Sequence, residues 1–297
     1  MRKVLLLLVL VIVALATTAA IAVNYQRPIR TITVEDDSGT LLVYFRQPER
    51  LVVLDASAGR LLRQIGLEAR VVGVSEEAAE LFPDAELLGP VGQADPLSIV
   101  ALRPDLVLMG RESLQLSQRL RSGGVNVWLS APASVEQLLS GIVRLGKLLD
   151  REYSAHQLAE QLENQLFGWR QNNAVGGTTR ALLWLDEQLT TAGSGTMESD
   201  LLILAGGVNV VETSGYAPLS LQEGLLLAPQ VIFAPPTLIQ QLSQLIQQTE
   251  ALGQPPSPDQ SPPPRLITLP QDLAQVNWET ALTRVDWIGH QLSTDFR

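Results

Sequence analysis

Residues 150–171 have the sequence DREYSAHQLAEQLENQLFGWRQ, and this stretch predicts one long helix. Asp150 is a candidate N-cap, and apolar side chains recur at three- and four-residue steps along one stripe. The stripe comprises Ala155, Leu158, Ala159, Leu162, Leu166 and Phe167. At about 1.5 Å per residue the helix is roughly 30 Å long, close to the width of a small domain. We therefore expect a connecting helix between two lobes.

The segments on either side of this helix share one pattern. LSIVALRPDLVLMG (residues 97–110) and LQEGLLLAPQVIFAPP (residues 221–236) each combine a short amphipathic helix, a proline and a β-branched apolar run. Proline cannot continue a helix, so Pro104 and Pro229 predict helix-to-strand corners. Continuous apolar strands that alternate with helices are typical of parallel sheets covered on both faces. The pattern predicts an α/β fold with two Rossmann-like lobes, and it favours an internal duplication.

The predicted boundaries follow from this pattern. The N-terminal lobe covers residues 31–149, the connecting helix residues 150–171, and the C-terminal lobe residues 178–297. The first lobe opens with ITVEDDSGTLLVYF, which predicts a β-hairpin with its turn at residues 36–39. Ser-Val-Glu-Gln at residues 134–137 fits a capping box at the start of a helix.

Two segments lie outside the pattern. Residues 1–23 begin with two basic side chains, continue with an uncharged apolar run at 4–23, and contain a small-x-small pattern at 20–22. These features predict either a cleaved signal peptide or an N-terminal membrane anchor, because the run is long enough to cross a bilayer. The second segment, QPPSPDQSPPP at residues 254–264, predicts an exposed Pro-rich loop, with a docking motif as the alternative. We expect an exported protein, in the periplasm or on the outer face of the cytoplasmic membrane.

The composition excludes several classes of function. The 297-residue chain has no cysteine, which excludes disulfides, zinc–thiolate sites and thiol nucleophiles. Its formal net charge of −10 disfavours nucleic acid as a partner. The two histidines, His156 and His290, have no acidic partner at ligand spacing, so we expect no metal site.

The sequence contains none of the common catalytic or phosphate-binding motifs. No G-x-S-x-G, no G-x-x-x-x-G-K and no strand-linked G-x-G-x-x-G occurs. Gly193-Ser194-Gly195-Thr196 precedes a predicted helix, whose N-terminus could hold an anion, but a tight turn is the favoured interpretation. The sequence therefore predicts a binding protein without catalytic residues or a resident cofactor.

Four stretches in this order carry a family resemblance. PERLVVLDASAGRLLRQIGLEARVVGVS (48–75), VGQADPLSIVALRPDLVLMG (91–110), TAGSGTMESDLLILAGGVNVVE (191–212) and LSLQEGLLLAPQVIFAPP (219–236) resemble the periplasmic-binding-protein family for cobalamin, haem and iron–siderophores. The resemblance covers about residues 32–292. It implies two α/β lobes on a single rigid helix, with the ligand in the cleft between them. It also implies the solute-binding component of an ABC importer, a monomer that delivers a tetrapyrrole or metal chelate to a membrane permease.

The resemblance implies pocket loops after the carboxyl ends of the strands, where α/β sheets bind ligands. The expected ligand-binding residues are Ser57, Phe82, Gln93 and Arg111 in the first lobe and Thr191, Tyr216 and Asp272 in the second. Tyr216 and Phe82 are expected as aromatic faces against a flat ring, and Arg111 as a partner for a ligand carboxylate. Packing of each aromatic on its own lobe, and plain solvation of Arg111, are the alternatives.

The expected permease-docking residues depart from the family pattern. Members of the family typically carry a docking glutamate on the helix before each x-P-D strand, and these places correspond to Leu97 and Gln222. Glu223 lies next to the second place and can partly substitute for that glutamate, whereas Leu97 cannot. The alternative function is therefore a membrane-anchored domain of the same fold that senses or scaffolds and delivers nothing to a permease.

Overall fold

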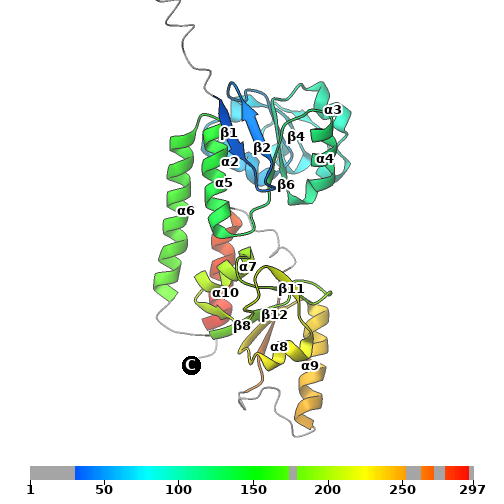
Figure 1. Cartoon of the computed structure of the whole chain (residues 1–297), viewed down its shortest axis with the longest axis vertical. Helices are drawn as coiled ribbons and strands as arrows, with labels where there is room; N and C mark the ends of the chain where they lie inside the picture. Colours follow the sequence, from blue (N-terminus) through cyan, green and yellow to red (C-terminus); the bar gives the residue numbers. More distant parts are fainter. Residues whose placement is uncertain (1–30, 174–178, 252–261, 271–277, 294–297) are drawn as a thin grey trace, which may run out of the picture.

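The computed structural model describes residues 31–173, 179–251, 262–270 and 278–293. These residues form two α/β lobes that lie one above the other in Figure 1. The lobes are connected by α6 (Glu152–Asn173), which runs from the first lobe to the second. The predicted fold class, two parallel sheets joined by a long helix, is confirmed.

The first lobe contains a five-stranded parallel sheet in the order β5-β4-β3-β6-β7. Its strands are β3 (Leu51–Val53), β4 (Val71–Val74), β5 (Glu86–Leu87), β6 (Leu106–Gly110) and β7 (Val127–Ser130). Its α-helices are α2 (Ala56–Gln64), α3 (Pro96–Ala101), α4 (Leu114–Ser122) and α5 (Val135–Leu148). Its short 3-10 helices are η1 (Glu68–Arg70), η2 (Glu76–Leu81), η3 (Val91–Gln93) and η4 (Arg111–Ser113). Alternate side chains of the central strands pack against α2 and α5 on one face and against α3 and α4 on the other.

The second lobe contains a four-stranded parallel sheet in the order β10-β8-β12-β13. Its strands are β8 (Thr179–Leu183), β10 (Gly207–Asn209), β12 (Val231–Ala234) and β13 (Arg265–Thr268). A separate antiparallel pair consists of β9 (Thr190–Ala192) and β11 (Tyr216–Pro218). Its helices are α7 (Met197–Leu204), α8 (Leu221–Leu226), α9 (Pro236–Ala251) and α10 (Thr280–Ser293). Side chains of α8 and α9 cover one face of the sheet, and α7 and α10 cover the other.

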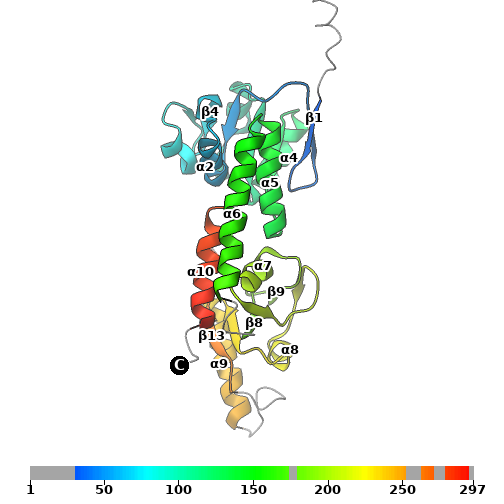
Figure 2. The ribbon, with the colours of Figure 1, turned by 90° about the vertical axis from the view of Figure 1, so that its left-hand side faces the viewer.

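The connecting helix is shifted from its predicted place. The sequence predicts residues 150–171, whereas α6 covers Glu152–Asn173 and packs between α5 and α10 (Figure 2). The prediction that Asp150 caps this helix is wrong, because Asp150 precedes the cap position and has a left-handed φ of 60°. It forms the reversal between α5 and α6. Of the predicted apolar stripe, Phe167 is 53% exposed.

One buried cluster of apolar side chains runs through both lobes and includes the inner face of α6. The close crossing of α5 and α6 depends on Gly146, where an added Cβ would lie 2.1 Å from the Cβ of Ala155. Because of this tight contact, α5 and α6 pack closely against each other beside the first lobe.

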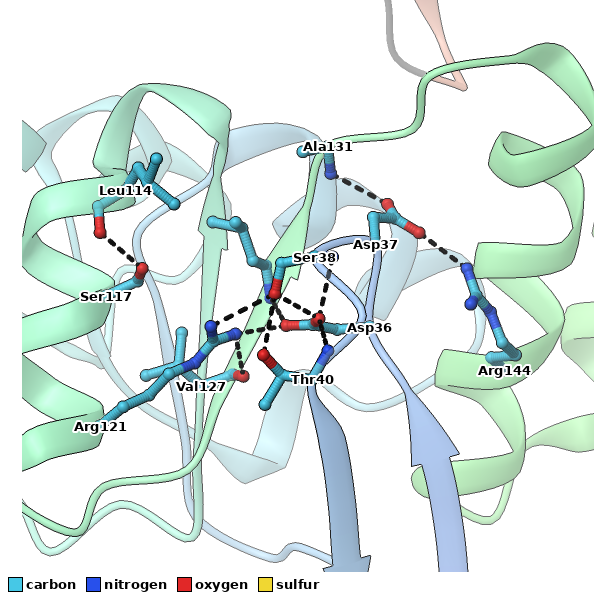
Figure 3. A network of polar contacts seen from close by, with 11 residues as sticks. Asp36, Asp37, Ser38, Thr40, Leu114, Ser117, Arg121, Val127, Ala131 and Arg144 are labelled. Carbon is cyan, nitrogen blue, oxygen red and sulfur yellow. Dashed lines mark hydrogen bonds and ion pairs between the residues drawn. The ribbon is translucent and has the colours of Figure 1, made fainter. Parts of the chain in front are cut away.

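The predicted hairpin is confirmed as β1 (Ile32–Glu35) paired with β2 (Leu41–Tyr44). Its turn is fastened to the first lobe by two adjacent carboxylates, as Figure 3 shows. Asp36 forms an ion pair with Arg121 and accepts a hydrogen bond from the Leu129 N–H (3.0 Å). Asp37 pairs with Arg144 (2.7 Å), and burial raises the pKa of this carboxyl above its usual range. The hairpin is thus held rigidly against β7 and α5.

Helix caps follow the sequence signals only in part. Ser134 caps α5, and its hydroxyl accepts a hydrogen bond from the Gln137 N–H (3.1 Å). The Gln137 side chain accepts from the Ala133 N–H (2.9 Å) rather than from Ser134, so the predicted box is shifted by one residue. A complete capping box occurs instead at α8, between Ser220 and Glu223.

Some predictions fall on residues outside the described part of the chain. These are the N-terminal segment 1–23, most of the Pro-rich loop at 254–264, and Asp272. Within the described ranges, no helix has both the length and the apolar character needed to cross a membrane.

Candidate functional site

Two of the predicted ligand-binding residues meet where the lobes face each other. Arg111 directly follows β6 of the first lobe, and Tyr216 opens β11 of the second. The Tyr216 hydroxyl donates a hydrogen bond to Oε2 of Glu198 (2.9 Å), and the Arg111 guanidinium interacts with the same hydroxyl. We call Arg111, Tyr216 and Glu198 the interlobe triad.

The charges around Tyr216 act on its proton in opposite directions. Burial, followed by the neighbouring Glu198, raises the pKa of the Tyr216 phenol to about 12, although Arg111 partly offsets them. The phenol is therefore neutral at physiological pH and serves as a hydrogen-bond donor. The residue as a whole remains 43% exposed, and it lies beside the Arg111 cation.

Sequence reasoning missed Glu198, which is only 4% exposed. It lies in the first turn of α7, whose N-cap Thr196 accepts from the Ser199 N–H (3.3 Å) and donates to the Gly193 carbonyl (2.7 Å). An acidic residue in a first turn is favoured by the helix dipole in any helix. The pattern T-M-E-S-D therefore indicated a helix start and gave no separate signal for a buried carboxylate beside Tyr216.

Further contacts between described residues join the lobes. Oδ2 of Asp200 accepts a hydrogen bond from the Val135 N–H at the start of α5 (3.0 Å). The Trp278 indole N–H donates to the Ser57 carbonyl (3.1 Å), and Arg60 forms an ion pair with Glu279. Burial raises the pKa of Asp200 above its usual range. The short segment formed by Trp278 and Glu279, just before α10, thus lies on the first lobe's α2.

This segment changes the expectation for Ser57. Its side chain is buried at the start of α2, and its backbone is covered by Trp278. A cavity of about 30 Å³ remains there, bounded by Ser57, Trp128 and Trp278 among others. That volume holds water but no organic ligand. Ser57 therefore faces a water-sized space in this structure.

Phe82, Gln93 and Thr191, which are also predicted to bind the ligand, are not part of the triad. Phe82 is 5% exposed and packs in the first-lobe core against Gly59, so its ring offers no face to a ligand. Gln93 is exposed on η3. Thr191 is 1% exposed, and its hydroxyl donates to the Ala217 carbonyl (2.9 Å) within the β9–β11 pair.

A larger pocket of about 520 Å³ lies within the second lobe alone. It is lined by Arg180, Thr191, residues 210–213, residues 217–219 and residues 226–228. The volume is in the range of small-molecule sites. The pocket lining includes Ala217 but none of Arg111, Tyr216 and Glu198. The pocket and the interlobe triad are therefore two different places.

The three positions considered for permease docking are all on the surface. Leu97 on α3 is 77% exposed, and Gln222 and Glu223 are exposed on α8. Glu223 has a local role, because its carboxylate accepts from both the backbone N–H (3.1 Å) and the hydroxyl (2.6 Å) of Ser220. These hydrogen bonds lower the pKa of Glu223 below its usual range.

The described residues offer no cluster of metal ligands. Among the residues with described placement, no three His, Asp or Glu side chains lie close enough to hold a metal ion. His156 is exposed on α6, and His290 lies 3.8 Å from Asp286 on the surface of α10.

A Tyr216→Phe chain is expected to differ from the native chain in a pH-dependent way. The pKa of the Tyr216 phenol is about 12 in the folded state against an ordinary 10.0. The protonated phenol therefore stabilises the folded state fully below pH 10.0, and this stabilisation is lost as pH rises through 12. The difference between the two chains' urea midpoints should be constant from about pH 7 to the ordinary phenol pKa and then shrink. A difference that stays constant over the whole range contradicts the contact with Glu198.

Comparisons with known proteins give three results. The sequence model of a family described as periplasmic binding protein matches residues 51–254. The vitamin B12-binding proteins of Yersinia pestis (strain Pestoides F) and Yersinia pseudotuberculosis serotype O:1b (strain IP 31758) are each 30% identical over 140 residues. Each match covers 45% of this chain and 50% of the relative, so the chain spans about half the length of the curated relatives it matches.

Solved structures share the fold at lower identity. A possible iron-binding periplasmic solute-binding protein from Staphylococcus epidermidis has a TM-score of 0.64 at 15% identity, and the match covers 82% of this chain and 98% of that protein. A haem-binding protein from Pseudomonas aeruginosa has a TM-score of 0.59 at 20% identity, and the match covers 84% of this chain and 94% of that protein. The vitamin B12-binding protein of Vibrio cholerae has a TM-score of 0.57 at 22% identity, and the match covers 82% of this chain and 96% of that protein.

Proposed function

This chain belongs to the periplasmic binding protein family, and from that premise we propose that it is the exported solute-binding component of an ABC importer. It binds a cobalamin, a haem or an iron–siderophore reversibly between its lobes and releases it unchanged to a membrane permease. The matched relatives and fold neighbours include proteins named for vitamin B12, haem and iron, which supports this ligand class.

One observation carries the proposal, namely the interlobe triad. Arg111 follows the carboxyl end of β6, on the side where α/β sheets bind ligands, and it meets Tyr216 of the other lobe there. A flat macrocycle or a catecholate can stack on the ring of Tyr216, and Arg111 can pair with a ligand carboxylate. Of the predicted contact residues, we propose these two for direct binding, with Glu198 as the group that orients Tyr216.

A thermal-shift screen tests this function. The full-length chain is heated with cyanocobalamin, haemin or one of several ferric siderophores, and a ligand at a hundredfold excess over its Kd should stabilise the native state by about 2.7 kcal/mol. Tyr216→Ala should abolish the shift because the stacking face is lost. Tyr153→Ala is the matched control, since Tyr153 is 76% exposed on α6. If none of the three classes raises the unfolding temperature of the native chain, the ligand assignment is wrong.

The second candidate is a membrane-anchored domain that senses or scaffolds. The observation that favours it is Leu97, an apolar residue that is 77% exposed where the family's docking glutamate is expected. Glu223 is engaged in capping its own helix at the other docking position. A ligand-induced shift combined with no stimulation of a permease ATPase by the chain would favour this candidate over import.

A further inference from the structure

The outer face of the β1–β2 hairpin carries an unusual apolar stripe. Leu41, Val43 and Phe45 are 63%, 51% and 72% exposed, respectively. The alternate residues Leu42 and Tyr44 are 4% and 8% exposed and pack into the first lobe. We call Leu41, Val43 and Phe45 the outer stripe. Because strand side chains alternate, Leu41 and Val43 lie on one face of β2, about 7 Å apart, and Phe45 directly follows the strand.

The hairpin cannot rotate to bury the outer stripe in the first lobe. Asp36 and Asp37, at the hairpin turn, are held by Arg121, Arg144 and backbone N–H groups of the β7 region (Figure 3). The inner face of the same strand already belongs to the buried core. Single exposed apolar residues are normal, but a contiguous and rigidly presented set is typical of an interaction surface.

The chain sequence indicates what covers this surface. Residues 24–31 separate β1 from the uncharged apolar run at 4–23. Eight residues reach at most about 29 Å, so a membrane that holds the run lies within this distance of the first strand. Ile32 pairs with Tyr44, which places Phe45 at the same end of the hairpin as the link to the run.

The charges at this end fit a lipid surface. Arg46 is exposed directly after the stripe, and Arg27 and Arg30 lie in the link that precedes β1. The sequence on both sides of the hairpin is therefore basic, in a chain whose formal net charge is −10. Basic residues beside apolar side chains are typical of segments that lie at the boundary between headgroups and acyl chains.

We propose that the apolar run remains attached as an anchor and that the outer stripe rests on the outer surface of the same membrane. The contact would hold the first lobe in a fixed orientation on the bilayer. This inference adds to the exported location in the proposed function, and it does not depend on which ligand is bound.

The absence of cysteine permits a sharp test. Full-length chains carrying Val43→Cys or Leu97→Cys are labelled with the environment-sensitive dye NBD and placed in vesicles of phosphatidylglycerol and phosphatidylcholine in equal parts. Leu97 is the matched control, because it is an exposed apolar residue of the same lobe on α3, away from the hairpin (Figure 1). Circular dichroism and unchanged unfolding temperatures verify that both variants fold.

The label at position 43 should emit at shorter wavelength and be quenched by doxyl-labelled lipid at least about threefold more than the label at position 97. Equal quenching at the two positions overturns the inference. A blue shift that needs no lipid and accompanies a doubled mass in detergent also overturns it, since the occupant is then a second copy. An intact mass that lacks residues 1–23 overturns the anchor, while the ligand screen remains a separate test of the binding function.

Discussion

An Asp36→Ala chain is expected to lose about 3–5 kcal/mol of unfolding free energy, because removal of one partner from a buried ion pair leaves the other charge unpaired. The Asp36 side chain is 0% exposed. Besides Arg121, its carboxylate accepts hydrogen bonds from the N–H groups of Ser38 (2.9 Å), Thr40 (3.0 Å) and Leu129 (3.0 Å). Alanine would leave all these donors without their acceptor, and each buried donor adds its own desolvation cost.

Urea denaturation followed by circular dichroism measures this loss. Asp84→Ala is the matched control, since Asp84 is exposed in the same lobe and its replacement should change stability by no more than about 0.5 kcal/mol. Hydrogen exchange should also become faster across β1 and β2 in the Asp36 variant, because the turn no longer fastens the hairpin. A loss below about 1 kcal/mol would show that the network contributes little to the first lobe.

The fold could be predicted because its signals are local. Pro104 and Pro229 each stand between a helix and a strand, as expected for residues that cannot continue a helix. The residues before them, Arg103 and Ala228, have left-handed φ values of 48° and 51°. This conformation could not be predicted, since residues other than glycine rarely adopt it and tertiary packing must enforce it. Its occurrence at both corners strengthens the similarity between the two halves.

The site was only partly predictable because it depends on contacts that cross from lobe to lobe. The family resemblance implies cleft positions for Arg111 and Tyr216, and in the structure these two residues meet across the lobes. Phe82 could not be placed, since an aromatic residue before a proline has the same local pattern whether it faces a cleft or a core. Its burial depends on Gly59, where an added Cβ would lie 3.0 Å from the ring. Nothing near Phe82 in the sequence indicates that contact.

Gly193 controls the position of the triad in the second lobe. Its N–H donates to the Gly215 carbonyl (2.9 Å), and the next residue, Ser194, donates to the Thr213 carbonyl (2.8 Å). An added Cβ at Gly193 would lie 1.9 Å from that Thr213 carbonyl oxygen. The two backbone segments therefore approach as closely as they do only because no side chain stands between them. One segment leads into α7 with Glu198, and the other leads into Tyr216.

Gly193→Ala is accordingly expected to force these segments apart, separate Tyr216 from Glu198 and lower the unfolding free energy by about 2–3 kcal/mol. Ligand affinity should fall at least about tenfold, which corresponds to about 1.4 kcal/mol, and the phenol pKa should move from about 12 toward its ordinary 10.0. Calorimetry with the ligand found in the thermal screen measures the ligand affinity, and ultraviolet titration measures the phenol pKa. Gly92→Ala is the control, because an added Cβ there meets no atom within 4 Å. If Gly193→Ala binds and titrates like Gly92→Ala, the close approach does not position Tyr216, and the second lobe must hold this ring through other contacts.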